Sequence, residues 1–154
     1  MTLLLAFLIG FLTGLRSFTP AAVTAWGVYL GWVNPGGWLA GIGTGWGVLV
    51  LTVLALAELA ADKSPRMGNR TSFRGLAARL FMGALTGACI AGAGGEGLAI
   101  GVLLGGAGGA AGCFAGYHAR KRLVQAWGKP DFHAALMEDA VCIGGSIWVA
   151  TRFI

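Results

Sequence analysis

Residues 98–117 read LAIGVLLGGAGGAAGCFAGY, and this stretch decides the fold class. It carries no charged side chain, and an α-helix of about 20 apolar residues is long enough to cross the ~30 Å hydrocarbon core of a bilayer. Small residues spaced four apart form a flat stripe on which a second helix packs closely. The glycines with this spacing are Gly101, Gly105 and Gly109, continued by Gly112 and Gly116. The stretch therefore predicts a tightly packed transmembrane helix.

The composition of the whole chain supports the same class. Hydrophobic residues make up 56% of the 154 positions, and a further 28 positions are glycine. Charged residues are 11%, against ~25% in soluble domains, so the chain cannot cover a water-exposed surface with polar atoms. The glycines follow no three-residue period, which excludes collagen. We expect an all-α integral membrane protein in which residues 1–154 form a single glycine-rich domain.

About five transmembrane helices are predicted from the apolar runs. Their approximate ranges are 1–33, 37–60, 75–93, 98–117 and 130–152. The first is broken at Arg16–Pro20, because Pro20 removes a helical hydrogen bond and clashes with the preceding turn. A single broken crossing is favoured, with the N-terminus in the cytoplasm. The alternative is a re-entrant pair of half-helices, which would place the N-terminus outside.

Basic residues gather in two segments, 62–79 and 118–130, separated by two predicted helices. Because they flank long apolar runs, the positive-inside rule places both segments in the cytoplasm. Nucleic-acid binding is excluded on the same ground. The segments are either topology signals alone or contacts for anionic lipid headgroups. The candidate lipid-facing residues are Lys63, Arg66, Arg70, Arg74, Arg120 and Lys121.

The break in the first helix is the first candidate site. Arg16, Ser17 and Thr19 would lie within the membrane beside backbone groups that Pro20 releases, and discontinuous helices of this kind build transporter binding sites. The equally favoured alternative is that Arg16 pairs with an acidic residue of another helix and locks the bundle.

Four carboxylates near one membrane face are the second candidate site: Glu58, Asp62, Glu138 and Asp139. Ionisable groups at such depth are costly and often mark an ion or proton pathway. The alternative is ion pairing with basic residues such as Arg120 or Lys121. Any metal would be bound by the same four carboxylates, because His118 and His133 fall at no recognised ligand spacing. No enzyme motif is present, and the sequence predicts neither a catalytic residue nor a cofactor.

Three motifs carry a resemblance to a known family. GLRSFTPA at 14–21, ELAADKSP at 58–65 and Glu138-Asp139 resemble a bacterial family of small membrane proteins catalogued only as a domain of unknown function. The resemblance implies a multi-pass protein of a bacterial inner membrane and supplies no activity. The second motif also looks like the Glu-x-Gly-Asp-Lys-Ser/Thr signature of a calcium and manganese exchanger family. It departs from that signature by one extra residue, by Ala61 in place of glycine, and by the lack of a second copy.

These features together predict a transporter or channel for an ion or small charged solute. We expect the break residues and the four carboxylates to line its pathway. Because five helices are few to enclose a pathway, we also expect a homo-oligomer that assembles through the glycine stripes. A non-transporting protein that organises lipids or partner helices is the competing class. A membrane enzyme acting on a lipid headgroup is the third.

Overall fold

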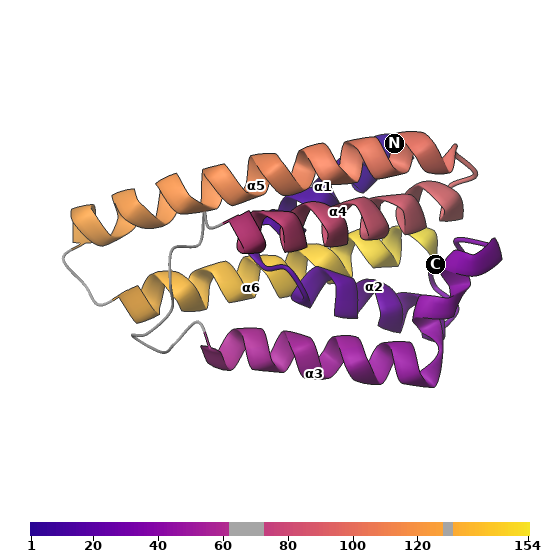
Figure 1. Cartoon of the computed structure of the whole chain (residues 1–154), viewed down its shortest axis with the longest axis horizontal. Helices are drawn as coiled ribbons and strands as arrows, with labels where there is room; N and C mark the ends of the chain where they lie inside the picture. Colours follow the sequence, from indigo (N-terminus) through magenta and orange to yellow (C-terminus); the bar gives the residue numbers. More distant parts are fainter. Residues whose placement is uncertain (62–72, 128–130) are drawn as a thin grey trace.

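The computed structural model describes residues 1–61, 73–127 and 131–154, and these segments are helices joined by turns (Figure 1). The α-helices among them are α1 (Thr2–Leu15), α2 (Thr19–Tyr29), α3 (Gly45–Ala61), α4 (Phe73–Ala93), α5 (Leu98–Trp127) and α6 (Asp131–Ala150). Two 3-10 helices, η1 (Gly37–Gly43) and η2 (Thr151–Phe153), precede α3 and follow α6. The predicted all-α class is confirmed.

Three segments of the described chain are long and apolar enough to cross a membrane: Gly75–Ala93, Leu98–Leu123 and His133–Phe153. A fourth is obtained if η1 and α3 count as one bent span. The helices thus fit a membrane protein with three or four candidate spans, rather than the five that we expected. The difference lies in the N-terminal region, where α1 is apolar but has only 14 residues.

The span predicted over residues 37–60 is not one straight helix, because η1 and α3 meet at an angle of 60°. Thr44, between them, has an extended backbone, with φ −71° and ψ 155°. Its hydroxyl donates to the Gly41 carbonyl at 2.9 Å and accepts the Gly47 N–H at 3.2 Å. A threonine hydroxyl that accepts an N–H of the first turn is a helix N-cap, so α3 begins here.

The second basic segment also differs from the prediction. We expected a loop over residues 118–130, but α5 continues as a helix to Trp127, and residues 128–130 lie outside the described part. Residues 118–127 contain Ala, Arg, Lys, Leu and Gln, which are good helix formers, and neither Gly nor Pro. The basic residues within 118–127 therefore belong to α5 instead of forming a loop.

The N-terminal region is a helical hairpin, not the single broken helix on which the favoured crossing rested. α1 runs parallel to α5, with Gly10 beside Gly105 and Gly14 beside Gly109. α2 runs antiparallel to α3, with the Phe18 N–H on Glu58 and Val28 beside Gly43. Figure 1 shows the two half-helices running in opposite directions along the bundle. The N-terminal hairpin thus comprises α1, the turn Arg16–Phe18 and α2.

Proline position explains the difference. Arg16 is extended, with φ −136° and ψ 120°, and the chain reverses within the three residues of the turn. Pro20 lies in the first turn of α2, where no N–H is needed for a helical hydrogen bond. Pro20 therefore begins a helix here instead of interrupting one.

The bundle has two ends. The terminal end holds the N-terminus, the C-terminus, η1 and the α4–α5 turn, where Thr2 contacts Gly94 and the Pro35 carbonyl contacts Gly92. The basic end holds the last turns of α3 and α5 and the first turns of α4 and α6 (Figure 1).

Glycine contacts hold α5 against α4 and α1. A Cβ atom on Gly105 would overlap the Gly83 carbonyl, and one on Gly112 would overlap the Phe11 carbonyl. The stripe on α5 therefore packs against two neighbours inside the chain. The homo-oligomer stays a prediction, and these contacts indicate that it would use other faces.

Candidate functional site

A buried ion pair holds the turn of the N-terminal hairpin. Arg16 Nη2 lies 2.5 Å from Asp139 Oδ1 of α6, with 2% of the arginine side chain and 9% of the aspartate side chain exposed. Taking either charge out of water alone costs several kcal/mol, which the other charge offsets. The predicted pairing of Arg16 with an acidic residue of another helix is confirmed.

Glu58 binds the backbone of the same turn. Its Oε1 accepts the Ser17 N–H at 2.8 Å, and its Oε2 accepts the Phe18 N–H at 2.9 Å. These N–H groups precede the first turn of α2, where the helix dipole is positive and no carbonyl of the helix is available to accept them. A carboxylate from α3 therefore caps α2 from outside.

The Thr19 hydroxyl completes this group. Thr19 is 4% exposed, and its Oγ1 has no hydrogen-bond partner among the described residues. A buried hydroxyl without a partner costs about 1–3 kcal/mol, so it offers a donor and an acceptor to a small bound solute. We call this group the hairpin turn site. Its members are Arg16, Ser17, Phe18, Thr19, Glu58 and Asp139.

Helix α6 faces both arms of the hairpin beside this site. The Cys142 thiol donates to the Leu12 carbonyl of α1 at 3.6 Å, and Ala150 lies beside Gly27 of α2. Between them, the buried Ser146 hydroxyl has no partner among the described residues. The buried face of α6 thus carries polar groups from Asp139 toward the terminal end.

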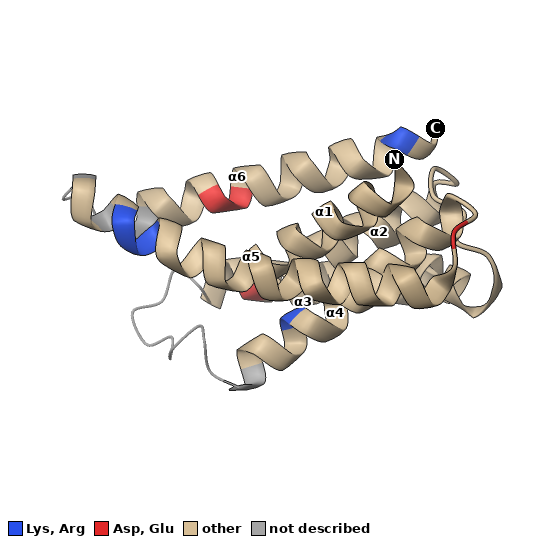
Figure 2. Cartoon of the chain, turned by 90° about the horizontal axis from the view of Figure 1, so that it is seen from above, with Lys and Arg blue, Asp and Glu red and all other residues tan. Residues whose placement is uncertain are grey.

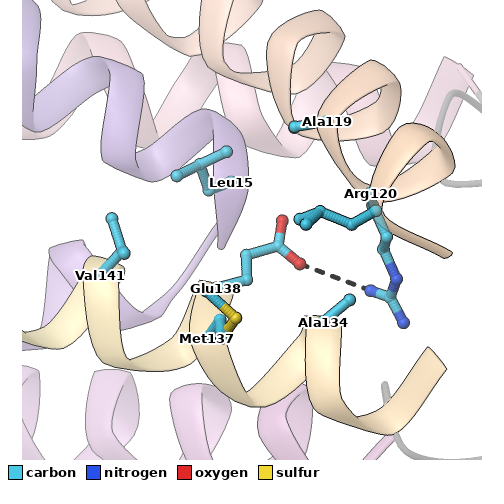
Figure 3. Close-up of a pocket in the computed structure, with 9 residues that line it drawn as sticks. Leu15, Ala119, Arg120, Ala134, Met137, Glu138 and Val141 are labelled. Atoms are coloured by element: carbon cyan, nitrogen blue, oxygen red, sulfur yellow. Dashed lines mark hydrogen bonds and ion pairs between the residues drawn. The ribbon is translucent and has the colours of Figure 1, made fainter. Parts of the chain in front are cut away.

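Glu138 points into a pocket of about 180 Å³ between α5 and α6, whose lining contains no residue of the hairpin turn site (Figure 3). Its Oε2 lies 3.4 Å from Arg120 Nη1 of α5, as one of our alternatives expected. The remaining lining is apolar: Leu15, Gly116, Ala119, Leu123, Ala134, Met137 and Val141. The structure thus separates two neighbouring carboxylates that we had assigned to one pathway.

Comparison with known proteins gives one match, a family model that covers residues 3–152. The chain belongs to the DUF4126 family. The family is described as a domain of unknown function, so the expected resemblance to such a family is confirmed. No curated protein and no solved structure matched the chain in the other comparisons. The DUF4126 match contains the hairpin turn site and the α5–α6 pocket, which therefore both belong to the family domain.

Arg79 is a buried charge of this DUF4126 chain that sequence reasoning missed as a site residue. Its Nη1 lies 3.9 Å from the Cys113 thiol of α5. We had counted it with the basic segment 62–79. Its position four residues before Gly83, which packs on α5, was the signal that its side chain faces the bundle interior.

The remaining predicted residues lie toward the basic end. Lys121 is exposed on α5, among the Lys and Arg positions at that end of the helix in Figure 2. The side chain of Arg74 falls outside the described residues, and so do Asp62, Lys63, Arg66 and Arg70. Contact of this segment with anionic lipid stays a prediction.

Metal ligation was the alternative role of the four carboxylates. Over residues 1–61, 73–127 and 131–154, no three His, Cys, Asp or Glu side chains gather closely enough to hold a metal ion. Glu58 binds backbone N–H groups, Asp139 binds Arg16, and Glu138 binds Arg120. In these contacts Glu58, Asp139 and Glu138 bind different groups instead of converging on one point.

Proposed function

We propose that the chain is a membrane transporter or channel for an ion or small charged solute, and that the hairpin turn site is where the solute binds. One observation carries the proposal: the turn of a re-entrant hairpin is held by carboxylates from two other helices. Half-helices that meet inside a membrane bundle, with helix ends and charges facing one another, form the solute sites of many transporters.

The charges of the site favour a cation or a proton. The site contains two carboxylates, Glu58 and Asp139, but one guanidinium, that of Arg16, which pairs with Asp139. A cation bound to Glu58, or a proton on it, weakens the charge-assisted hydrogen bonds to the Ser17 and Phe18 N–H groups. The turn is then held less firmly. Solute binding and movement of the hairpin are thereby coupled through one side chain.

For orientation, the proposal places the basic end in the cytoplasm, following the positive-inside rule. The hairpin then enters from the opposite face, and its turn lies near the cytoplasmic ends of the spans. The bent η1–α3 pair, α4, α5 and α6 would cross the membrane. Since few helices cross, we retain a homo-oligomer as part of the proposal.

Flux through the purified protein in liposomes tests this function. Proton and monovalent-cation fluxes are followed with entrapped dyes for the wild type, Glu58→Gln and Asp139→Asn. We expect about tenfold or greater loss in both variants, as for removal of a charged hydrogen bond worth 1.5–3 kcal/mol. The matched control is Glu96→Gln, since Glu96 is exposed at the terminal end. Equal flux in the wild type, Glu58→Gln and Asp139→Asn would refute the proposal.

The long α5 favours one second candidate, a protein that organises anionic lipid. α5 projects beyond its apolar part with Lys121 and Arg122 exposed. Each such residue near an anionic surface contributes about 1 kcal/mol of attraction. If the wild type shows no flux for any ion tested, yet binds anionic vesicles more tightly than neutral ones, this candidate replaces transport.

A further inference from the structure

We infer that the pocket between α5 and α6 binds an amphipathic amine, with its ammonium group on Glu138 and its apolar chain against the pocket wall. The inference concerns binding at a site separate from the hairpin turn site. It holds whether or not the protein transports a solute.

The pocket has a mostly apolar lining with two charged side chains. Seven of its nine lining residues are apolar or glycine, and the other two are Glu138 and Arg120. Pockets of this kind take ligands with a large apolar part and a few polar groups that fix their orientation. The ligand is therefore amphipathic, with a single charged group.

The order of the residues along the pocket gives the sign of that charge. Leu15 and Val141 lie on one side of the Glu138 carboxylate, and the Arg120 guanidinium lies on the other (Figure 3). A cation on Glu138 has its chain directly against the apolar side. An anion on Arg120 would lie beside the Glu138 carboxylate, which repels it and, on a shorter side chain, cannot move away toward the helix end as Arg120 can. The geometry thus selects an ammonium head.

The ion pair in the pocket is suited to exchange. The distance of 3.4 Å between Arg120 Nη1 and Glu138 Oε2 is longer than the ~2.7–2.9 Å of a charge-assisted hydrogen bond. A protonated amine therefore replaces Arg120 with a closer partner. Arg120 lies nearer the end of α5 than Gly116 does, so its guanidinium has water and lipid headgroups within reach when displaced.

Gly116 makes room for the head group. A Cβ atom at this position would lie 2.6 Å from Leu15 Cδ2 and 3.4 Å from Glu138 Oε1. Any larger residue would push Leu15 into the pocket or displace the carboxylate.

Photolabelling tests the inference with the full chain in detergent. The probe is dodecylamine with a diazirine in its chain, and dodecanoate with the same diazirine is its anionic counterpart. We expect saturable labelling by the amine that unlabelled dodecylamine competes away, and mass spectrometry should place it on Leu123, Met137 or Val141. Labelling elsewhere, or labelling that does not saturate, would overturn the inference.

Variants of Glu138 and Arg120 test whether the bound head group is a cation or an anion. Glu138→Gln should weaken amine binding about tenfold or more, the loss expected for one charged hydrogen bond. Arg120→Gln should strengthen amine binding severalfold, because it removes the group that competes for Glu138. The opposite pair of effects, or preferential labelling by dodecanoate, would show an anion site and overturn the assignment.

A shape variant decides the matter if Glu138→Gln does not fold. Ala134→Phe fills the pocket without changing a charge and should abolish saturable labelling. Ala140→Phe is the matched control, since Ala140 is exposed on α6 outside the pocket and should label like the wild type. Equal labelling of these two variants would refute binding in the pocket.

Discussion

At the scale of single residues, two acidic side chains stabilise one turn in different ways. Asp139 neutralises the Arg16 side chain, whereas Glu58 binds the backbone next to it. The Arg16–Asp139 contact joins two buried, opposite charges. The Glu58 contact joins a carboxylate to backbone N–H groups at a helix end, where no carbonyl of the helix is available to accept them. Substitution of Glu58 and of Asp139 should therefore lower the stability of the protein by different amounts.

Glu58→Gln should lower the free energy of unfolding by about 1–3 kcal/mol, because an amide has one acceptor oxygen where the carboxylate has two. Thermal unfolding of the detergent-purified protein measures this loss. Glu96→Gln removes an exposed carboxylate and should leave the melting temperature unchanged. Equal melting temperatures for the wild type, Glu58→Gln and Glu96→Gln would show that the Glu58 contacts contribute no stability.

The Arg16–Asp139 pair should show strong coupling in a double-mutant cycle. Arg16→Met or Asp139→Leu alone leaves a buried charge without its counter-ion, a loss of about 3–5 kcal/mol. The double variant removes both charges and should recover most of that stability. Denaturant unfolding of the four proteins gives the coupling energy. Additive losses in the double variant would mean that the two charges do not stabilise each other.

The pairing of Arg16 with an acid was predictable from its depth in an apolar run, but its partner was not. Asp139 lies 123 positions away in the chain, and only packing of α6 across the hairpin brings it close. The role of Glu58 was harder to predict, since its partners are backbone N–H groups that every residue type except proline would supply at positions 17 and 18.

At the scale of elements, the apolar runs predicted α4, α5 and α6 well, because hydrophobicity and length determine a span. The first run was misassigned for a specific reason. Proline interrupts a helix when it lies in the interior, but it fits the first turn of a helix, where Pro20 lies. The start of α2 at this point is stabilised by Glu58 of α3, which the local sequence does not reveal. The bend at Thr44 likewise depends on a local cap that apolar composition does not show.

Neighbouring glycines of α5 offer a matched test of its packing. Gly105→Ala should destabilise the protein by about 1–3 kcal/mol or more, because its Cβ atom would overlap the Gly83 carbonyl. Gly106→Ala should stabilise it by about 0.5–1 kcal/mol through helix propensity, since its Cβ atom would lie 4.0 Å from Ala84 Cβ. Thermal unfolding of both variants checks the sign. Equal effects would mean that α5 does not pack through Gly105.

At the scale of the whole molecule, the hairpin changes which segments share an end of the bundle. With one broken crossing, the N-terminus would lie at the basic end with Gln125. With the hairpin, it lies at the terminal end with η1 and the α4–α5 turn. The charge pattern does not distinguish these arrangements, because the first basic residue after Arg16 is Lys63. The contacts of Thr2 with Gly94 and of Pro35 with Gly92 do distinguish them, because they place the N-terminus beside the α4–α5 turn.

Cysteine labelling of intact cells tests this arrangement directly. In a background with Cys89, Cys113 and Cys142 replaced by alanine, single cysteines are placed directly after Met1, at Trp38, at Glu96 and at Gln125. The first three sites lie at one end of the bundle and the fourth at the other. An impermeant maleimide should therefore label the first three sites from the same side, and Gln125 only after the membrane is opened. Agreement of the N-terminal site with Gln125 would restore the single broken crossing. It would also separate the turn from Glu58, on which the proposed solute site depends.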